Sequence, residues 1–136
     1  MMSESMTSEM KICLQAWKDC QSACTEAMNY CADPQGQCLE MTLLCMMRDC
    51  AEMCMMCANL MSDGSEFMGR AALLCAEMCE RCAMTCSQMN NPKLTELAVL
   101  CHRCAEQSKQ VGTKAIAYFR RTNFVTEPTL LTSAIA

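Results

Sequence analysis

One stretch of the sequence decides the fold: Cys75-Ala76-Glu77-Met78-Cys79-Glu80-Arg81-Cys82-Ala83-Met84-Thr85-Cys86. Its cysteines follow the pattern C-x3-C-x2-C-x3-C, and the intervening residues are mostly strong helix formers without Gly or Pro. On a helix turning 100° per residue, the four thiols fall within a stripe about 60° wide. The stretch therefore predicts a helix that carries sulfur along the face where a core helix usually carries Leu and Ile.

The whole chain is also unusually rich in sulfur-containing side chains. The 136 residues include 15 Cys and 16 Met but only three Phe and one Trp, so sulfur-containing side chains replace the usual core material of a single domain. The segment Met1–Glu9 has neither the basic nor the apolar part of a secretion signal, and no apolar run reaches the length of a membrane span. We therefore expect a cytoplasmic protein, in which dense cysteine indicates metal or redox chemistry. The net charge of −4 disfavours nucleic-acid binding.

Three turn signals divide the chain into four helical segments. The signals are Asp33-Pro34-Gln35-Gly36, Ser62-Asp63-Gly64-Ser65 and Asn90-Asn91-Pro92. The segments between them predict helices over about 7–32, 37–61, 66–89 and 93–121. Short connections make consecutive helices antiparallel, so we predict an all-α, up-down-up-down four-helix bundle with a cysteine-lined core. The bundle is expected to occupy residues 1–121, and residues 122–136 a C-terminal tail.

The cysteines of these predicted helices are in register across the turns. In an antiparallel helix pair, two residues at the same height along the bundle have residue numbers that add up to a nearly constant sum. The cysteines of all three consecutive helix pairs meet this condition. Adjacent layers are about 5 Å apart, which allows neighbouring thiolates to share a metal ion. The predicted layers are Cys20/Cys50/Cys82/Cys101, Cys54/Cys79/Cys104, Cys24/Cys45/Cys86 beside Leu97, Cys13/Cys57/Cys75 facing Ser108, and Cys31/Cys38 near one end.

Several interpretations fit this cysteine array. Cysteine and methionine can fill a core as small apolar side chains, and disulfides could staple the helices or give a redox-active protein. Structural zinc prefers separate tetrahedral sets of four ligands, and iron–sulfur clusters use local cysteine runs. Soft thiolate and thioether ligands select Cu(I), and a continuous column of thiols can bind many Cu(I) ions in two- or three-coordinate sites. Copper storage is therefore the leading hypothesis, with the disulfide-stapled or redox-active protein and a zinc protein as alternatives.

The expected ligands are the thiolates of the predicted layers together with one thioether near the end of the third helix. On the fourth predicted helix, we expect the apolar inner face formed by Val111, Ala115 and Phe119 to close one end of the core. Metal is then expected to enter from the other end of the bundle. No nucleophile–base pair or phosphate-binding loop stands out, so an enzyme is not expected. The predicted metal ligands are Cys13, Cys20, Cys24, Cys31, Cys38, Cys45, Cys50, Cys54, Cys57, Cys75, Cys79, Cys82, Cys86, Cys101, Cys104 and Met89.

Three stretches make the chain resemble the bacterial copper storage proteins, a family of cysteine-rich four-helix bundles. They are 50–57 (CAEMCMMC), 75–86 and 97–108 (LAVLCHRCAEQS), within a resemblance that covers about residues 8–120. The last stretch departs from the family pattern, because Leu97 and Ser108 occupy positions where the family has cysteines. The resemblance implies storage of multiple Cu(I) ions per chain, assembly into tetramers, a cytosolic location and reduced capacity on the last helix. A copper-exchange partner protein is also expected.

Overall fold

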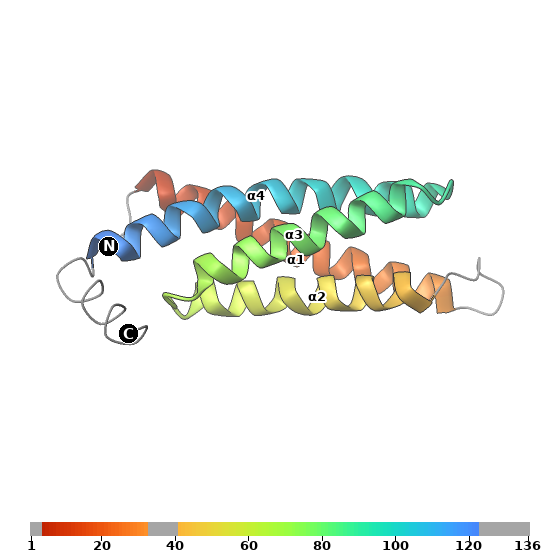
Figure 1. Ribbon diagram of the computed structural model, residues 1–136, viewed down its shortest axis with the longest axis horizontal. Helices are drawn as coiled ribbons and strands as arrows, with labels where there is room; N and C mark the ends of the chain where they lie inside the picture. Colours follow the sequence, from red (N-terminus) through yellow and green to blue (C-terminus); the bar gives the residue numbers. More distant parts are fainter. Residues whose placement is uncertain (1–3, 33–40, 123–136) are drawn as a thin grey trace, which may run out of the picture.

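The chain folds into four long helices joined by short connections (Figure 1). The structure is a computed structural model that describes residues 4–32 and 41–122, and Cys38 and the predicted tail beyond Thr122 lie outside these ranges. The helices are α1 (Glu4–Ala32), α2 (Met41–Ser62), α3 (Met68–Ser87) and α4 (Pro92–Thr122). Each helix packs against its two neighbours in the order α1–α2–α3–α4 and back to α1. The predicted antiparallel four-helix bundle is confirmed.

Local sequence explains both described turns. Gly64 has a φ of 69°, in the left-handed region that glycine adopts without strain, and the following Ser65 N–H donates to the carbonyl of Leu60 at 2.9 Å. At the second turn, the side-chain oxygen of Asn91 accepts hydrogen bonds from the N–H groups of Lys93 (3.0 Å) and Leu94 (3.3 Å). Asn91 therefore caps α4, and Pro92 occupies the first helical position, where its missing N–H costs nothing.

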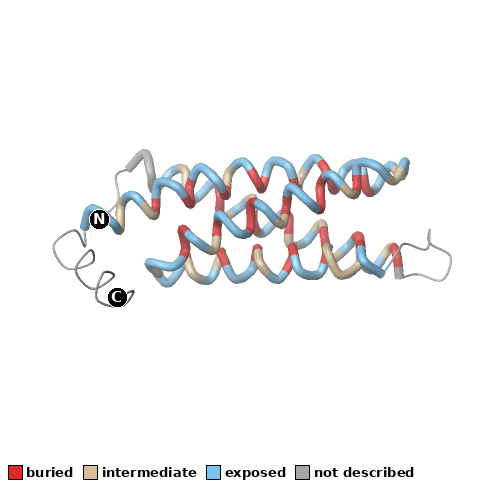
Figure 2. The backbone as a smooth tube through the Cα atoms, in the orientation of Figure 1, coloured by how far each residue is buried: buried red, intermediate tan, exposed pale blue. Residues whose placement is uncertain are grey.

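Each helix contributes one buried stripe whose residues alternate in spacing between three and four positions. This spacing keeps the stripe on one face of a helix, and the four stripes meet along the axis of the bundle (Figure 2). Within the described ranges, no helix combines the length and apolar character that crossing a membrane requires. The stripes are Cys13-Trp17-Cys20-Cys24-Ala27-Cys31, Leu43-Met47-Cys50-Cys54-Cys57-Met61, Met68-Ala72-Cys75-Cys79-Cys82-Cys86 and Leu94-Leu97-Cys101-Cys104-Ser108-Val111-Ala115.

The α3–α4 pair is the closest-packed of the four helix pairs. A Cβ atom added to Gly112 would lie 2.8 Å from the carbonyl oxygen of Gly69, and one added to Gly69 would lie 2.7 Å from Cγ1 of Ile116. Such distances are shorter than van der Waals contact, so the two helix backbones approach to a separation that side chains at these positions would prevent.

Candidate metal centre

The buried stripes bring eight cysteines into three overlapping groups. In each group, the four sulfur atoms lie within 4.8 Å of one another. Consecutive groups share two thiols, Cys20 with Cys50 and then Cys54 with Cys79, so the groups form one continuous column rather than separate sites. The groups are Cys20/Cys24/Cys50/Cys101, Cys20/Cys50/Cys54/Cys79 and Cys54/Cys75/Cys79/Cys104.

The sulfur–sulfur distances in this column suit metal coordination. Cys50 and Cys79 lie 3.3 Å apart, Cys20 and Cys101 3.8 Å, and Cys54 and Cys104 3.9 Å, well beyond a disulfide bond. With a metal–thiolate bond of about 2.3 Å, sulfurs would be about 3.8 Å apart in a tetrahedral site, about 4.0 Å in a trigonal site and about 4.6 Å in a linear one. The separations of 3.8 and 3.9 Å therefore fit trigonal and tetrahedral sites, whereas the 3.3 Å contact between Cys50 and Cys79 would have to lengthen for both sulfurs to bind one ion. The sharing of thiols between groups decides against independent tetrahedral sites, because eight thiols cannot supply three separate sets of four.

Hydrogen bonding divides the core thiols into proton donors and acceptors. The pKa of Cys50 is lowered, chiefly by Cys101, because neighbouring thiols donate to its sulfur. The pKa of Cys79 is raised, with Cys104 as the largest cause, because its thiol keeps its proton in such a contact. Interaction with Cys101 lowers the pKa of Cys82 to about 5. Copper binding replaces these shared protons by a metal ion and releases them, so the dry core does not accumulate unpaired thiolate charge.

A tryptophan interrupts the column toward the N-terminal end of α1. Trp17 is fully buried, and its indole N–H donates to the hydroxyl of Ser108 at 2.8 Å. Ser108 in turn donates to the carbonyl oxygen of Cys104 at 2.6 Å. Beside this pair, burial raises the pKa of Cys13 to about 12, with a further contribution from Cys75. Cys13 lies outside the three thiol groups.

The remaining predicted ligands occupy several environments. Cys31, Cys57, Cys82 and Cys86 are buried along the same stripes but outside the three groups. Met89 is half-buried and packs against the core, just beyond the end of α3. Cys38 lies outside the described residues. The individual assignment of these cysteines and of Met89 as ligands stays a prediction.

Two of the predicted layers differ from the structure. Cys45 is half-buried and lies off the core stripe of α2, where Leu43 and Met47 hold the inward positions, so its predicted place beside Cys24 and Cys86 is wrong. The thiol at 3.3 Å from Cys50 is that of Cys79 rather than that of the predicted partner Cys82, one turn away. The predicted set of Cys54, Cys79 and Cys104 is confirmed and gains Cys75.

The sequence reasoning missed two core residues, Trp17 and Met47. Both side chains are fully buried, and both positions follow the spacing that predicted the thiol positions. Trp17 lies four residues after Cys13, and Met47 lies three residues before Cys50. The alternating spacing of the stripes would have placed both residues in the core.

The fold and the thiol column together define a class of protein, a four-helix bundle that holds several metal ions in its interior. Comparison with known proteins gives the family. The sequence model described as "Csp: Copper storage protein" matches residues 6–113, so the chain belongs to the copper storage protein family.

Solved structures agree with this assignment. The Cu(I)-bound copper storage protein BsCsp3 is 28% identical, with a TM-score of 0.72 and a match covering 76% of this chain and 98% of that protein. A crystal structure of a Nitrosospira multiformis protein is 31% identical, with a TM-score of 0.72 and coverage of 79% and 97%. An uncharacterized cysteine-rich protein of Bacillus subtilis is 28% identical over 100 residues, 74% of this chain and 93% of that protein. The predicted function, storage of multiple Cu(I) ions by core thiolates, is confirmed.

Proposed function

We propose that this chain stores Cu(I) along the whole thiol column, with every core cysteine as a ligand and without catalysing a reaction. The observation that carries the proposal is the sharing of thiols between consecutive groups. Where most thiolates bridge two ions and each ion takes two thiolates, capacity approaches one ion per cysteine. The column continues beyond the three groups on both sides through Cys13, Cys31, Cys57, Cys82 and Cys86. We propose as additional ligands, near the α1–α2 end, Cys38, Cys45 and Met89.

Anaerobic titration of the reduced, metal-free protein with Cu(I) tests this capacity. Uptake of more than about ten ions per chain is expected if thiolates bridge throughout the column. Saturation at one or two ions would contradict storage and favour a single exchange site. A parallel titration with Zn²⁺ is the control, because tetrahedral sites that need four thiolates each would saturate at far fewer ions than a bridged Cu(I) column.

The cellular context of this function is also a proposal. We expect the residues of the bundle, 1–121, to act as one cytoplasmic storage unit, apart from the tail, and to exchange copper with a partner protein. Exposed apolar side chains on α3 and α4, including Leu74 (49% exposed), Met84 (63%) and Val99 (54%), support assembly of such units into tetramers. Sedimentation of the metal-free and copper-loaded protein tests the assembly. A monomer in both states at micromolar concentration would contradict it.

A further inference from the structure

One fully buried methionine lies on the same inward stripe of α2 as the thiols. Met47 is 0% exposed and lies three residues before Cys50, at a stripe position that a cysteine could equally hold. Its side chain carries a thioether, which is a soft ligand that suits Cu(I). A buried methionine beside a thiol column either fills space or binds metal, and the residues at the same height decide between these roles.

Contacts between thiols determine which residues lie at the height of Met47. The Sγ atom of Cys50 lies 3.3 Å from that of Cys79 on α3 and 3.9 Å from that of Cys20 on α1. Both neighbouring helices run antiparallel to α2, so moving back one stripe position on α2 corresponds to moving forward one stripe position on α1 and on α3. These steps lead from Cys50 to Met47, from Cys79 to Cys82 and from Cys20 to Cys24.

The two thiols at this height contact the rest of the column. Cys82 forms hydrogen bonds with Cys101 of α4 and with Cys24, and these are the two largest causes of its lowered pKa. Cys24 and Cys101 also belong to one of the four-thiol groups. All three cysteines are fully buried. Each helix therefore contributes one sulfur-containing residue to this part of the core, and the contribution of α2 is Met47.

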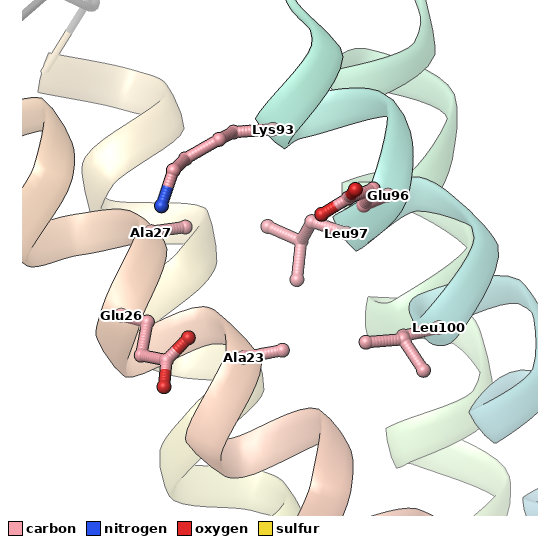
Figure 3. Close-up of a pocket in the computed structure, with 7 residues that line it drawn as sticks. All are labelled: Ala23, Glu26, Ala27, Lys93, Glu96, Leu97 and Leu100. Atoms are coloured by element: carbon pink, nitrogen blue, oxygen red, sulfur yellow. The ribbon is translucent and has the colours of Figure 1, made fainter.

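Beyond Cys101, the stripe of α4 supplies no further sulfur at this height. Its next position is Leu97, which is 2% exposed, and Figure 3 shows the Leu97 side chain extending toward α1 beside a small cavity of about 110 Å³. A hydrocarbon side chain has no ligand atom. An ion that binds Cys24 and Cys82 on the side away from Cys101 therefore finds its third ligand on α2, at the position of Met47.

Electrostatics favour a thioether as the third ligand. Two thiolates already outweigh the single positive charge of Cu(I), and a third thiolate would add more negative charge to a core that water does not reach. The thioether of Met47 adds a ligand without adding charge. It also favours Cu(I) over harder ions, because a thioether is a soft ligand.

We propose that Met47 is a copper ligand whose thioether completes a three-coordinate Cu(I) site with the thiolates of Cys24 and Cys82. The proposal rests on the storage function above. When the ion is transferred, its bonds to the carrier break, two copper–thiolate bonds and one copper–thioether bond form, and the two thiol protons pass to solvent. Copper stays Cu(I), so no oxidant or reductant is needed.

The test compares leucine substitutions at two buried methionines. Met47→Leu keeps the volume and apolar character of the side chain but removes its sulfur, and all 15 cysteines remain. After anaerobic equilibration of the copper-loaded protein with the chelator bathocuproine disulfonate, we expect Met47→Leu to retain about one Cu(I) ion per chain fewer than the wild type. The matched control, Met68→Leu, should retain the wild-type number. Met68 is 2% exposed and lies two stripe positions before Cys75, the first thiol of α3.

Two further measurements separate metal binding from packing. Met47→Cys restores a sulfur ligand and should recover the lost ion, although its side chain is smaller. In NMR spectra of the wild-type protein with isotopically labelled methionine methyl groups, the Met47 signal should shift more on Cu(I) loading than the Met68 signal. The two signals are assigned by their absence in the corresponding variants.

Equal ion counts in Met47→Leu and the wild type would overturn the proposal, as would equal losses in Met47→Leu and Met68→Leu or a Met47→Cys variant that still lacks the ion. If Met47→Leu does not fold, the wild-type spectra decide, with the Met47 signal assigned from Met47→Cys. A Met47 methyl signal that shifts no more than that of Met68 then overturns the proposal. Saturation of the wild-type protein at one or two ions would instead refute the storage function.

Discussion

The middle of the core and its end near Trp17 are built on the same spacing but differ in what occupies it. In the middle, Cys20, Cys50, Cys54 and Cys79 are each shared by two thiol groups, so the sulfurs form a connected column. Toward the end, Trp17 and Ser108 take two of the inward positions, and Cys13 stands outside the groups. The two regions therefore differ in how their thiols are connected rather than in burial, since Cys13 is as fully buried as the shared cysteines.

The largest expected effect comes from removing the shared thiols. The double substitution Cys50→Ala/Cys54→Ala leaves all three groups incomplete, because each group contains at least one of these two residues. We expect the Cu(I) capacity to fall by more ions than the thiols removed. The matched pair Cys13→Ala/Cys57→Ala, at the Trp17 end, should cost no more ions than thiols. Equal losses in the two variants, measured by anaerobic titration, would show that connectivity does not matter.

The second effect concerns the packing of the Trp17 end. Trp17→Ala leaves a cavity beside Ser108 and should lower the free energy of unfolding of the metal-free protein by about 3–5 kcal/mol. Trp17→Phe keeps most of the ring but loses the 2.8 Å hydrogen bond, and should cost about 1 kcal/mol. Denaturant unfolding of the reduced, metal-free proteins gives both values. A loss below 1 kcal/mol in Trp17→Ala would mean that this end is loosely packed.

The third effect is a dependence of stability on pH. The pKa of Cys13 is raised from 9.0 to about 12, so the folded state holds a proton that the unfolded state loses above pH 9. Its contribution to stability is therefore complete below pH 9 and is lost as the pH rises toward 12, with a slope of up to about 1.4 kcal/mol per pH unit.

Unfolding of the metal-free protein at several pH values above 9 measures this slope. Cys13→Ala should reduce it, while the copper-loaded protein should lack the contribution of every thiol that has already exchanged its proton for metal. A slope that is the same in Cys13→Ala and in the wild type would contradict the assignment to Cys13.

The smallest expected effect is a gain of one ion. Ser108→Cys places a thiol four residues after Cys104 and next to Cys13, and so extends the column to the Trp17 end. We expect one additional Cu(I) ion and a loss of stability of about 1 kcal/mol, because sulfur is a weaker acceptor for the Trp17 indole N–H. Ser108→Ala is the control and should lose stability without gaining capacity. No gain in Ser108→Cys would show that Trp17 isolates Cys13 by its bulk.

The sequence was sufficient for the fold and for the positions of most core thiols, because the cysteines follow the periodicity of buried helix faces. The error at Cys45 has a geometric cause. The sum of residue numbers across a turn tests whether two residues lie at the same height along the bundle. It does not test in which direction each side chain points around its helix. Cys45 is five residues from Cys50, which places it about 140° away around α2. The choice of Cys79 over Cys82 beside Cys50 depends on how far the helices slide along each other, which spacing within one helix cannot give.

The contact between Gly69 and Gly112 has a mechanical consequence. Because the backbones of α3 and α4 already touch there, this pair has no room to move closer and many contacts to lose by moving apart. The neighbouring seam, between α4 and α1, instead contains alanines and a cavity. In the bundle as described, the α3–α4 pair is therefore the stiffer of these two helix pairs, and the α1–α4 seam is the one with space left between its side chains.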